Sequence, residues 1–317
     1  MVTGVALFVM LVIIVSGAAV RLTGSGLACP TWPKCTSSSV VAPVAIHPWI
    51  EFANRLINAG IGIVALGTVA AALVRVRRRR DLTWLSVGLI VGVMVEIVLG
   101  GITVLYKLAP QLVAAHFLLA VLFLADALIL YHRAGWPDEE IPKRRGRARA
   151  AGTAALMVST GQRRLAGLLV AAAAVVVTLG TVVTSTGPHG GDPTAPRFAF
   201  SLHDVAQIHA DAADTFVGLV IVMCWWLARS GVARSVLRRA EVLLVVVVAQ
   251  GALGYVQYSM GDPATVVEFH VAGSVAVIVA TVAFYLGLSA RSRAPESTGE
   301  AAPSTVPITS PASLGVG

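Results

Sequence analysis

Three histidines and one asparagine occupy corresponding places in four long apolar segments of the 317-residue chain. When the chain is aligned with itself at an offset of about 155 residues, His116 falls on His270 and Asn54 falls on His209. Two neutral imidazoles from neighbouring helices, at one depth, suit the two axial positions of a haem iron, a large flat ligand that helix bundles accept. The spacing therefore predicts a haem site between His209 and His270 and a related site at Asn54 and His116.

The segment that carries Asn54 also begins with a carboxylate and a guanidinium, those of Glu51 and Arg55. Glu51 lies three residues before Asn54 and hence on the same helix face, directed at the same cavity. An acid inside a membrane is costly unless it is paired, so Glu51 is a candidate catalytic residue. Glu96 and Asp126 lie in two other apolar segments, and each of them either acts directly or pairs with polar side chains on nearby helices.

The remaining four histidines lie near the ends of the apolar segments. We expect His47, His189 and His203 in or beside the loops on the outer side, and His132 at the inner end of the fourth segment. All four are interpreted as interfacial residues. His203 is the one plausible rival to His209 as a ligand.

The elements that would position these side chains are membrane-spanning helices. The chain is 56% apolar and 13% charged, with a mean hydropathy of +0.82, whereas an ordinary soluble domain has about 25% charged residues. A spanning helix needs ~20 predominantly apolar residues. Such runs predict an all-α integral membrane protein with eight transmembrane helices, at about 4–22, 49–74, 82–105, 111–131, 165–184, 206–228, 240–258 and 266–289.

The basic residues predict how these helices are oriented. The formal net charge is +8, and 19 of the 24 lysines and arginines lie at 75–80, at 133–164, at 229–239 and after residue 290. With eight helices these regions share one side, which the positive-inside rule makes cytoplasmic together with both termini. The arginine clusters lack the aromatic interleaving and the fold signature of nucleic-acid-binding proteins, so we expect contact with membrane lipid and none with nucleic acid.

Two halves of the chain resemble each other. "GAAVRLTGSG" in the first segment resembles "GTVVTSTGPHG" after the fifth, and "VLGGITVLY" in the third resembles "AQGALGYVQY" in the seventh. Internal repeats of this kind often place binding sites at matching positions of each half. We therefore predict two pseudo-symmetric four-helix bundles, at 1–132 and 165–290, joined by a basic cytoplasmic linker at 133–164. The Ser-, Pro- and Ala-rich tail at 291–317 is expected to be a disordered cytoplasmic segment.

The three cysteines fall into two environments. Cys29 and Cys35 lie in the first outer loop, "GSGLACPTWPKC", where an oxidising compartment permits a disulfide bond. Two free thiols are the alternative. Cys224 lies inside the sixth segment and is expected to be a small packed hydrophobe.

With these features the sequence resembles the haem A synthases of bacterial and mitochondrial membranes. The resemblance covers residues 1–290 and rests on the eight-helix duplication, the "GSGLACPTWPKC" loop and the single histidine at the matching place of the fourth, sixth and eighth segments. It also includes the family's Glu-x-x-His-Arg motif, present here as Glu51-Phe-Ala-Asn54-Arg55. The departure is Asn54, where the motif usually has histidine.

The resemblance implies an oxidoreductase that oxidises a ring methyl group of haem O to the formyl group of haem A, for the assembly of cytochrome oxidase. His209 and His270 would ligate a haem b cofactor, and Glu51 would be the essential acid. Cys29 and Cys35 would form the disulfide of the outer loop. The implied partners are the haem O synthase that performs the farnesylation upstream and an electron donor, and the implied location is the bacterial plasma membrane.

The same resemblance places His116 at the substrate haem. Because Asn54 is short, we expect His116 alone to bind this iron and Asn54 to form a hydrogen bond beside it. Arg55 would pair either with Glu51 or with a haem propionate, and the sequence does not separate the two. Glu51, Arg55 and Asn54 could also form only an interfacial ion pair with a cap-like residue.

Two other functions fit part of the pattern. A bis-His b-type electron-transfer cytochrome of the plasma membrane would explain the bundles and the histidine pair, but it needs neither Glu51 nor a degenerate first site. A transporter built on repeats would need helices broken near the middle of the membrane. No proline or cluster of glycines interrupts the centres of the even-numbered segments, which argues against it.

Overall fold

The computed structural model describes residues 1–136 and 155–290, and these form eight long helices and one pair of two-residue strands. The strands β1 (Ala155–Leu156) and β2 (Ser289–Ala290) pair antiparallel. The helices are α1 (Val2–Leu22), α2 (Ile46–Leu73), α3 (Arg80–Leu105), α4 (Pro110–Ala134), α5 (Thr160–Thr186), α6 (Leu202–Arg229), α7 (Arg234–Ser259) and α8 (Ala264–Leu286). The all-helical class predicted for the chain is confirmed. Most of the expected linker at 133–164 and the whole expected tail at 291–317 lie outside the described residues.

Seven of the described helices are long and apolar enough to cross a membrane, namely α1 to α6 and α8. Helix α7 has 26 residues but is not among the seven. It begins with a charged stretch, "RSVLRRAE", before its valine-rich part. A multi-pass membrane protein is therefore supported by length and composition, while the eighth span remains a prediction.

The two halves match in the lengths of two helix pairs and in one unusual turn. Helices α2 and α6 both have 28 residues, and α3 and α7 both have 26. Before α4, Lys107 and Leu108 have φ values of 54° and 58°, and before α8, Gly261 and Asp262 have φ values of 75° and 57°. Two successive left-handed residues are uncommon outside glycine, so the shared conformation supports the duplication predicted from the sequence.

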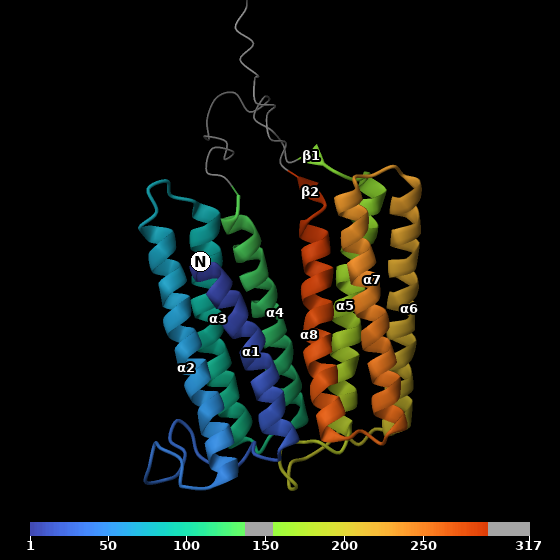
Figure 1. The fold of residues 1–317 in the computed structure, drawn as a ribbon. Helices are drawn as coiled ribbons and strands as arrows, with labels where there is room; N and C mark the ends of the chain where they lie inside the picture. The colour runs from blue at the N-terminus through green and yellow to red at the C-terminus, as the bar shows by residue number, and fades with distance from the viewer. Residues whose placement is uncertain (137–154, 291–317) are drawn as a thin grey trace, which may run out of the picture.

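The helices pack mainly with their chain neighbours. Helix α1 contacts α2 and α4, and α3 contacts α2 and α4. The second half repeats this order, because α5 contacts α6 and α8, and α7 contacts α6 and α8. Figure 1 shows α1 to α4 beside α5 to α8, and α8 contacts both α1 and α4. The apolar core of the first half continues across this boundary, since it includes Val275 and Ile278 of α8.

At one end of the molecule, loops from the two halves lie together. The loop from α1 to α2 and the loop from α5 to α6 lie together at the bottom of Figure 1. They are joined by a hydrogen bond of 2.8 Å from the Gly26 N–H to the Gly191 carbonyl. Beside them, Arg21 of α1 donates to the Thr184 carbonyl of α5. Helices α2, α4, α6 and α8 all begin at this end.

Candidate functional site

The four positions matched by the repeat lie at one level of the molecule. Asn54, His116, His209 and His270 each lie six to eight residues after the first residue of their helix. At a rise of 1.5 Å per residue this is ~9–12 Å below the loop end. All four side chains are partly exposed, so the protein itself does not enclose them.

His209 and His270 face each other across the second half. Their ring centroids are 6.5 Å apart and their planes make an angle of 74°. A metal–imidazole bond is about 2 Å long, and each centroid lies about 1 Å behind its nitrogen, so an iron atom between two axial imidazoles requires centroids about 6 Å apart. The separation of the two rings therefore matches that of two axial ligands of one haem.

Each of these histidines lies against a glycine of a neighbouring helix. A Cβ atom added at Gly180 of α5 would lie 3.1 Å from Cε1 of His209, and one added at Gly254 of α7 would lie 3.0 Å from Cε1 of His270. A side chain at either position would require the histidine ring to shift by a few tenths of an ångström. Sequence reasoning did not identify these glycines, although both lie in the stretches that match between the two halves, "GTVVTSTGPHG" and "AQGALGYVQY".

The first half has the same arrangement around His116. A Cβ atom at Gly100 of α3 would lie 3.3 Å from Cε1 of His116, and Gly100 precedes Gly254 by the same number of residues as His116 precedes His270. Glu96, one turn earlier on α3, places Oε2 2.5 Å from Nδ1 of His116. The Glu96 side chain is 9% exposed and the His116 side chain 36%.

The two acids that the sequence left open have different surroundings. Glu96 pairs with a polar side chain on the neighbouring helix, at the very residue predicted to hold the substrate haem. The carboxylate of Asp126 lies instead against Gly88 of α3. Gly88 is twelve residues from Gly100 on the same helix, which is roughly 18 Å along its axis. Asp126 therefore does not belong to the histidine site.

Asn54 is held by a residue that sequence reasoning did not identify. The Ser16 hydroxyl of α1 donates to Oδ1 of Asn54 at 2.8 Å. Gly17, next to Ser16, has nothing within 4 Å of a Cβ added there. The place that histidine rings occupy at the other three positions is thus open beside Asn54.

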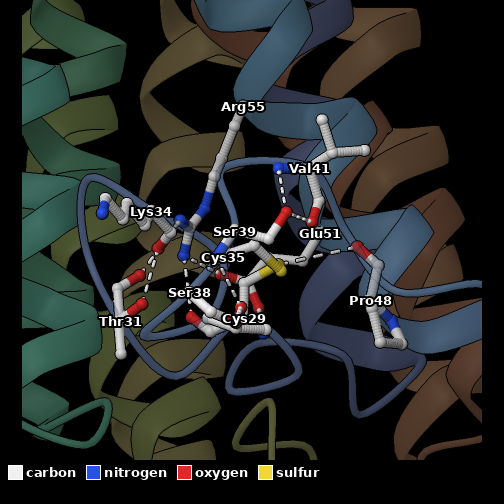
Figure 2. The surroundings of a disulfide bond; sticks show 11 residues. Cys29, Thr31, Lys34, Cys35, Ser38, Ser39, Val41, Pro48, Glu51 and Arg55 are labelled. Carbon is white, nitrogen blue, oxygen red and sulfur yellow. Dashed lines mark hydrogen bonds and ion pairs between the residues drawn. A yellow bond between two sulfur atoms is a disulfide. The ribbon is translucent and has the colours of Figure 1, made fainter.

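Glu51 and Arg55 join the start of α2 to the outer loop. Glu51 is 5% exposed. Its Oε2 accepts the Cys29 N–H at 2.7 Å, and its Oε1 accepts Nη2 of Arg55 at 2.5 Å. Arg55 is thus paired with Glu51, one of the two partners expected from the sequence. Figure 2 shows Arg55 reaching from α2 into the loop, where it also donates to the carbonyls of Cys29, Thr31 and Lys34.

The disulfide expected in this loop is present. Cys29 and Cys35 are bonded at an S–S distance of 2.01 Å, and both are fully buried (Figure 2). Trp32 lies between the two cysteines in the sequence, and its ring packs on Gly101 of α3, where a Cβ atom would overlap it. Gly101 is adjacent to Gly100, so the loop meets α3 at the level of the His116 site.

The other histidines lie near the helix ends, as expected. His47 is 2.9 Å from the Ser25 hydroxyl, and His189 is 2.7 Å from the Asp262 carbonyl. His132 packs edge-on against Trp136, with ring centroids 5.6 Å apart.

His203, the rival to His209, is 3.0 Å from the Tyr258 hydroxyl. The ring that faces His270 belongs to His209. Cys224 is partly buried and packs against the apolar core of the second half, as expected for a small hydrophobe.

The residues present suit haem better than a bare metal ion. Among residues 1–136 and 155–290, no three His, Cys, Asp or Glu side chains come together in a metal-binding group. A haem brings its own equatorial nitrogens and takes only axial ligands from the protein. His209 with His270, and His116 on its own, supply ligands of that kind.

The comparisons with known proteins agree with this geometry. Residues 1–282 match the family described as cytochrome oxidase assembly protein (COX15-CtaA). Relatives named heme A synthase are 35% identical in Geobacillus thermodenitrificans and 33% in Geobacillus kaustophilus over 116 residues, and 26% identical in Bacillus licheniformis over 122 residues. The matched stretch is 35% of this chain and 35% of the relative for the first two, and 38% and 40% for the third. The chain thus matches little more than a third of the length of these relatives.

Proposed function

Because the chain belongs to the cytochrome oxidase assembly protein family, we propose that it is a haem A synthase. This membrane oxidoreductase converts a ring methyl group of haem O to the formyl group of haem A. The observation that carries the proposal is the pair of facing rings of His209 and His270, 6.5 Å apart, together with a second and incomplete site at the matched positions of the first half. A purely electron-transferring cytochrome would not need the second site.

In this proposal the two halves are related four-helix bundles with different tasks. His209 and His270 hold haem b, whose iron supplies one-electron transfer when it is bound. Gly180 and Gly254 support this task because they leave room for the Cε1 atom of each ring beside the neighbouring helix.

The first half holds haem O. His116 is its axial ligand, and Asn54, kept in place by Ser16, leaves the opposite side open for oxidation of the ring substituent. Glu51 moves protons at its carboxylate oxygens during the successive oxidations. An ionised carboxylate has about four acceptor sites, and two of those on Glu51 are used by Cys29 and Arg55. Arg55 holds the Glu51 carboxylate against the loop.

The proposed partners follow from the substrate and the reaction. Haem O is delivered by the haem O synthase that farnesylates its precursor, and haem A leaves for cytochrome oxidase. Conversion of the methyl group to the formyl group removes electrons from the substrate, so it requires an oxidant, for which we propose dioxygen. Reductive activation of dioxygen also requires an electron donor, which exchanges electrons with haem b. All of these exchanges take place within the lipid of the bacterial plasma membrane.

The helix ends that carry the basic residues are proposed to face the cytoplasm. The test is a pair of reporters fused after residue 290, alkaline phosphatase for the periplasm and green fluorescent protein for the cytoplasm. We expect only the fluorescent fusion to be active, because 19 of the 24 basic residues lie on that side. The same pair inserted at Gly231, between α6 and α7, and at Gly261, between α7 and α8, tests α7, because these two sites lie on opposite sides of the membrane only if α7 crosses it. Phosphatase activity at residue 290 would overturn the eight-span topology.

Identification of the bound pigment tests the proposed function itself. The protein is purified from membranes, and its haems are extracted and separated. We expect haem b together with haem O or haem A. Haem b alone would identify an electron-transfer cytochrome, and the absence of haem would exclude both functions.

A further inference from the structure

At one matched position beside the histidines, α3 and α7 carry different polar residues. Glu96 of α3 and Gln250 of α7 are separated by the same number of residues as His116 and His270, so they occupy the same place in the two halves. Glu96 has a carboxylate oxygen 2.5 Å from Nδ1 of His116. The Gln250 amide instead donates to the backbone carbonyl of His270, at 2.9 Å. In the first half, an acid therefore contacts the imidazole ring of the histidine. In the second half, an amide contacts the main chain of the matched histidine.

The position of this acid is unusual for a transmembrane segment. Glu96 lies in the second half of α3, among the residues Val93 to Leu99 of an apolar helix, and its side chain is 9% exposed. A carboxyl group at such a place is expensive unless it is paired and serves a function. The group nearest to it is the imidazole that the proposed function assigns to the substrate haem.

At 2.5 Å from a carboxylate oxygen, Nδ1 is the nitrogen of His116 that is placed to carry the proton. A neutral imidazole carries a proton on one nitrogen only, so an Nδ1–H that donates to Glu96 leaves the lone pair on Nε2. Gly100, one turn further along α3, lets the ring lie against the helix in this orientation. Metal-bound histidines commonly donate their second N–H to a carboxylate, which fixes the ring and raises the basicity of the ligand.

We propose that Glu96 is a positioning residue of the substrate-haem site. Its carboxylate accepts the Nδ1–H of His116, directs Nε2 to the iron, and makes this iron harder to reduce than it would be with an amide at the same place. The inference rests on the proposed function, because it requires a haem at His116. It gives the two matched sites different electronic properties, with an electron-rich iron where oxidation occurs and a neutral ligand set where electrons are relayed.

The test compares Glu96→Gln with the unchanged protein after ferrous haem O is added to the detergent-solubilised full chain. The readout is the iron–histidine stretching band in resonance Raman spectra. Only five-coordinate ferrous haem gives this band, so the haem held by His209 and His270 does not contribute. We expect the band to move to lower frequency in Glu96→Gln. The amide oxygen is a weaker hydrogen-bond acceptor for the Nδ1–H than a carboxylate, so the imidazole of His116 donates less electron density to the iron.

A redox titration of the same haem gives the second readout. A tenfold change in the preference for the ferric form corresponds to about 59 mV for a one-electron couple, and we expect the midpoint potential in Glu96→Gln to rise by about that amount. Asp126→Asn is the matched control, because it removes another acid of the same half that lies against Gly88, away from the histidine site. It should leave both readouts unchanged.

The possible outcomes separate the two proposals. If no haem O binds beside haem b in the unchanged protein, the proposed function fails and this inference fails with it. If haem O binds and Glu96→Gln changes neither the band nor the potential, the inference alone is wrong. If Glu96→Gln no longer binds haem O, Glu96→Asp decides: restored binding supports the carboxylate contact, and continued loss reduces Glu96 to a packing role.

Discussion

Replacing His209 and His270 together by alanine is expected to abolish the low-spin, six-coordinate haem b spectrum of the purified protein. The two rings face each other at the separation that a shared iron requires, and alanine offers no ligand. Loss of the axial ligands removes the main means by which the protein holds the haem. The measurement is the reduced-minus-oxidised absorption spectrum, normalised to the amount of protein inserted in the membrane.

The matched control is His203→Ala. His203 is on the same helix as His209, one and a half turns nearer the loop, and its ring contacts the Tyr258 hydroxyl rather than His270. The haem b spectrum should survive this change. A full spectrum in the double alanine variant, or its loss in His203→Ala, would mean that another pair of ligands holds the haem.

A second variant tests the same pair without removing a ligand. His270→Met keeps a side chain that can bind iron, and a methionine–histidine pair raises the reduction potential of a haem. We expect haem b to remain bound, with a higher midpoint potential than in the unchanged protein. An unchanged potential would show that His270 is not an axial ligand, even if the alanine variants fail to fold.

Much of this architecture follows from the sequence because it depends on distances along the chain. The expected helices agree with the observed ones to within a few residues, since runs of apolar residues are read directly. The sequence predicts His209 and His270 at one depth, because they lie near the starts of two helices that run in the same direction, and the repeat register matches them to Asn54 and His116. The disulfide between Cys29 and Cys35 is predicted by the closeness of the two residues in one outer loop, and the structure contains it.

The features that sequence could not supply depend on how helices are rotated against one another. Neighbouring positions on a helix point in directions about 100° apart, so the same apolar stripe fits several rotations. Glu96 meets His116, and Asp126 does not, because of the rotation that packs Gly100 against the ring. The choice of Arg55 between Glu51 and a propionate likewise depended on the path of the outer loop.

Replacing Glu51 by glutamine is expected to lower the conversion of haem O to haem A by roughly 10²–10⁴-fold, the usual contribution of a general acid or base. Glutamine keeps the size of the side chain and one acceptor oxygen, but it cannot take up or release a proton. The measurement is the ratio of haem A to haem O in cells that carry the variant. Haem b bound at His209 and His270 should be unchanged, since Glu51 lies in the other half.

The structure also allows a purely mechanical role for Glu51, and Arg55 provides the comparison. Arg55 donates to three loop carbonyls besides its contact with Glu51, whereas Glu51 accepts the N–H of Cys29. If both residues only brace the loop, Arg55→Met should reduce haem A at least as much as Glu51→Gln. If Glu51 moves protons, Glu51→Gln should cause the much larger loss, although Arg55→Met disturbs the loop more. Near-normal haem A in Glu51→Gln, with the protein inserted and binding haem b, would leave only the bracing role.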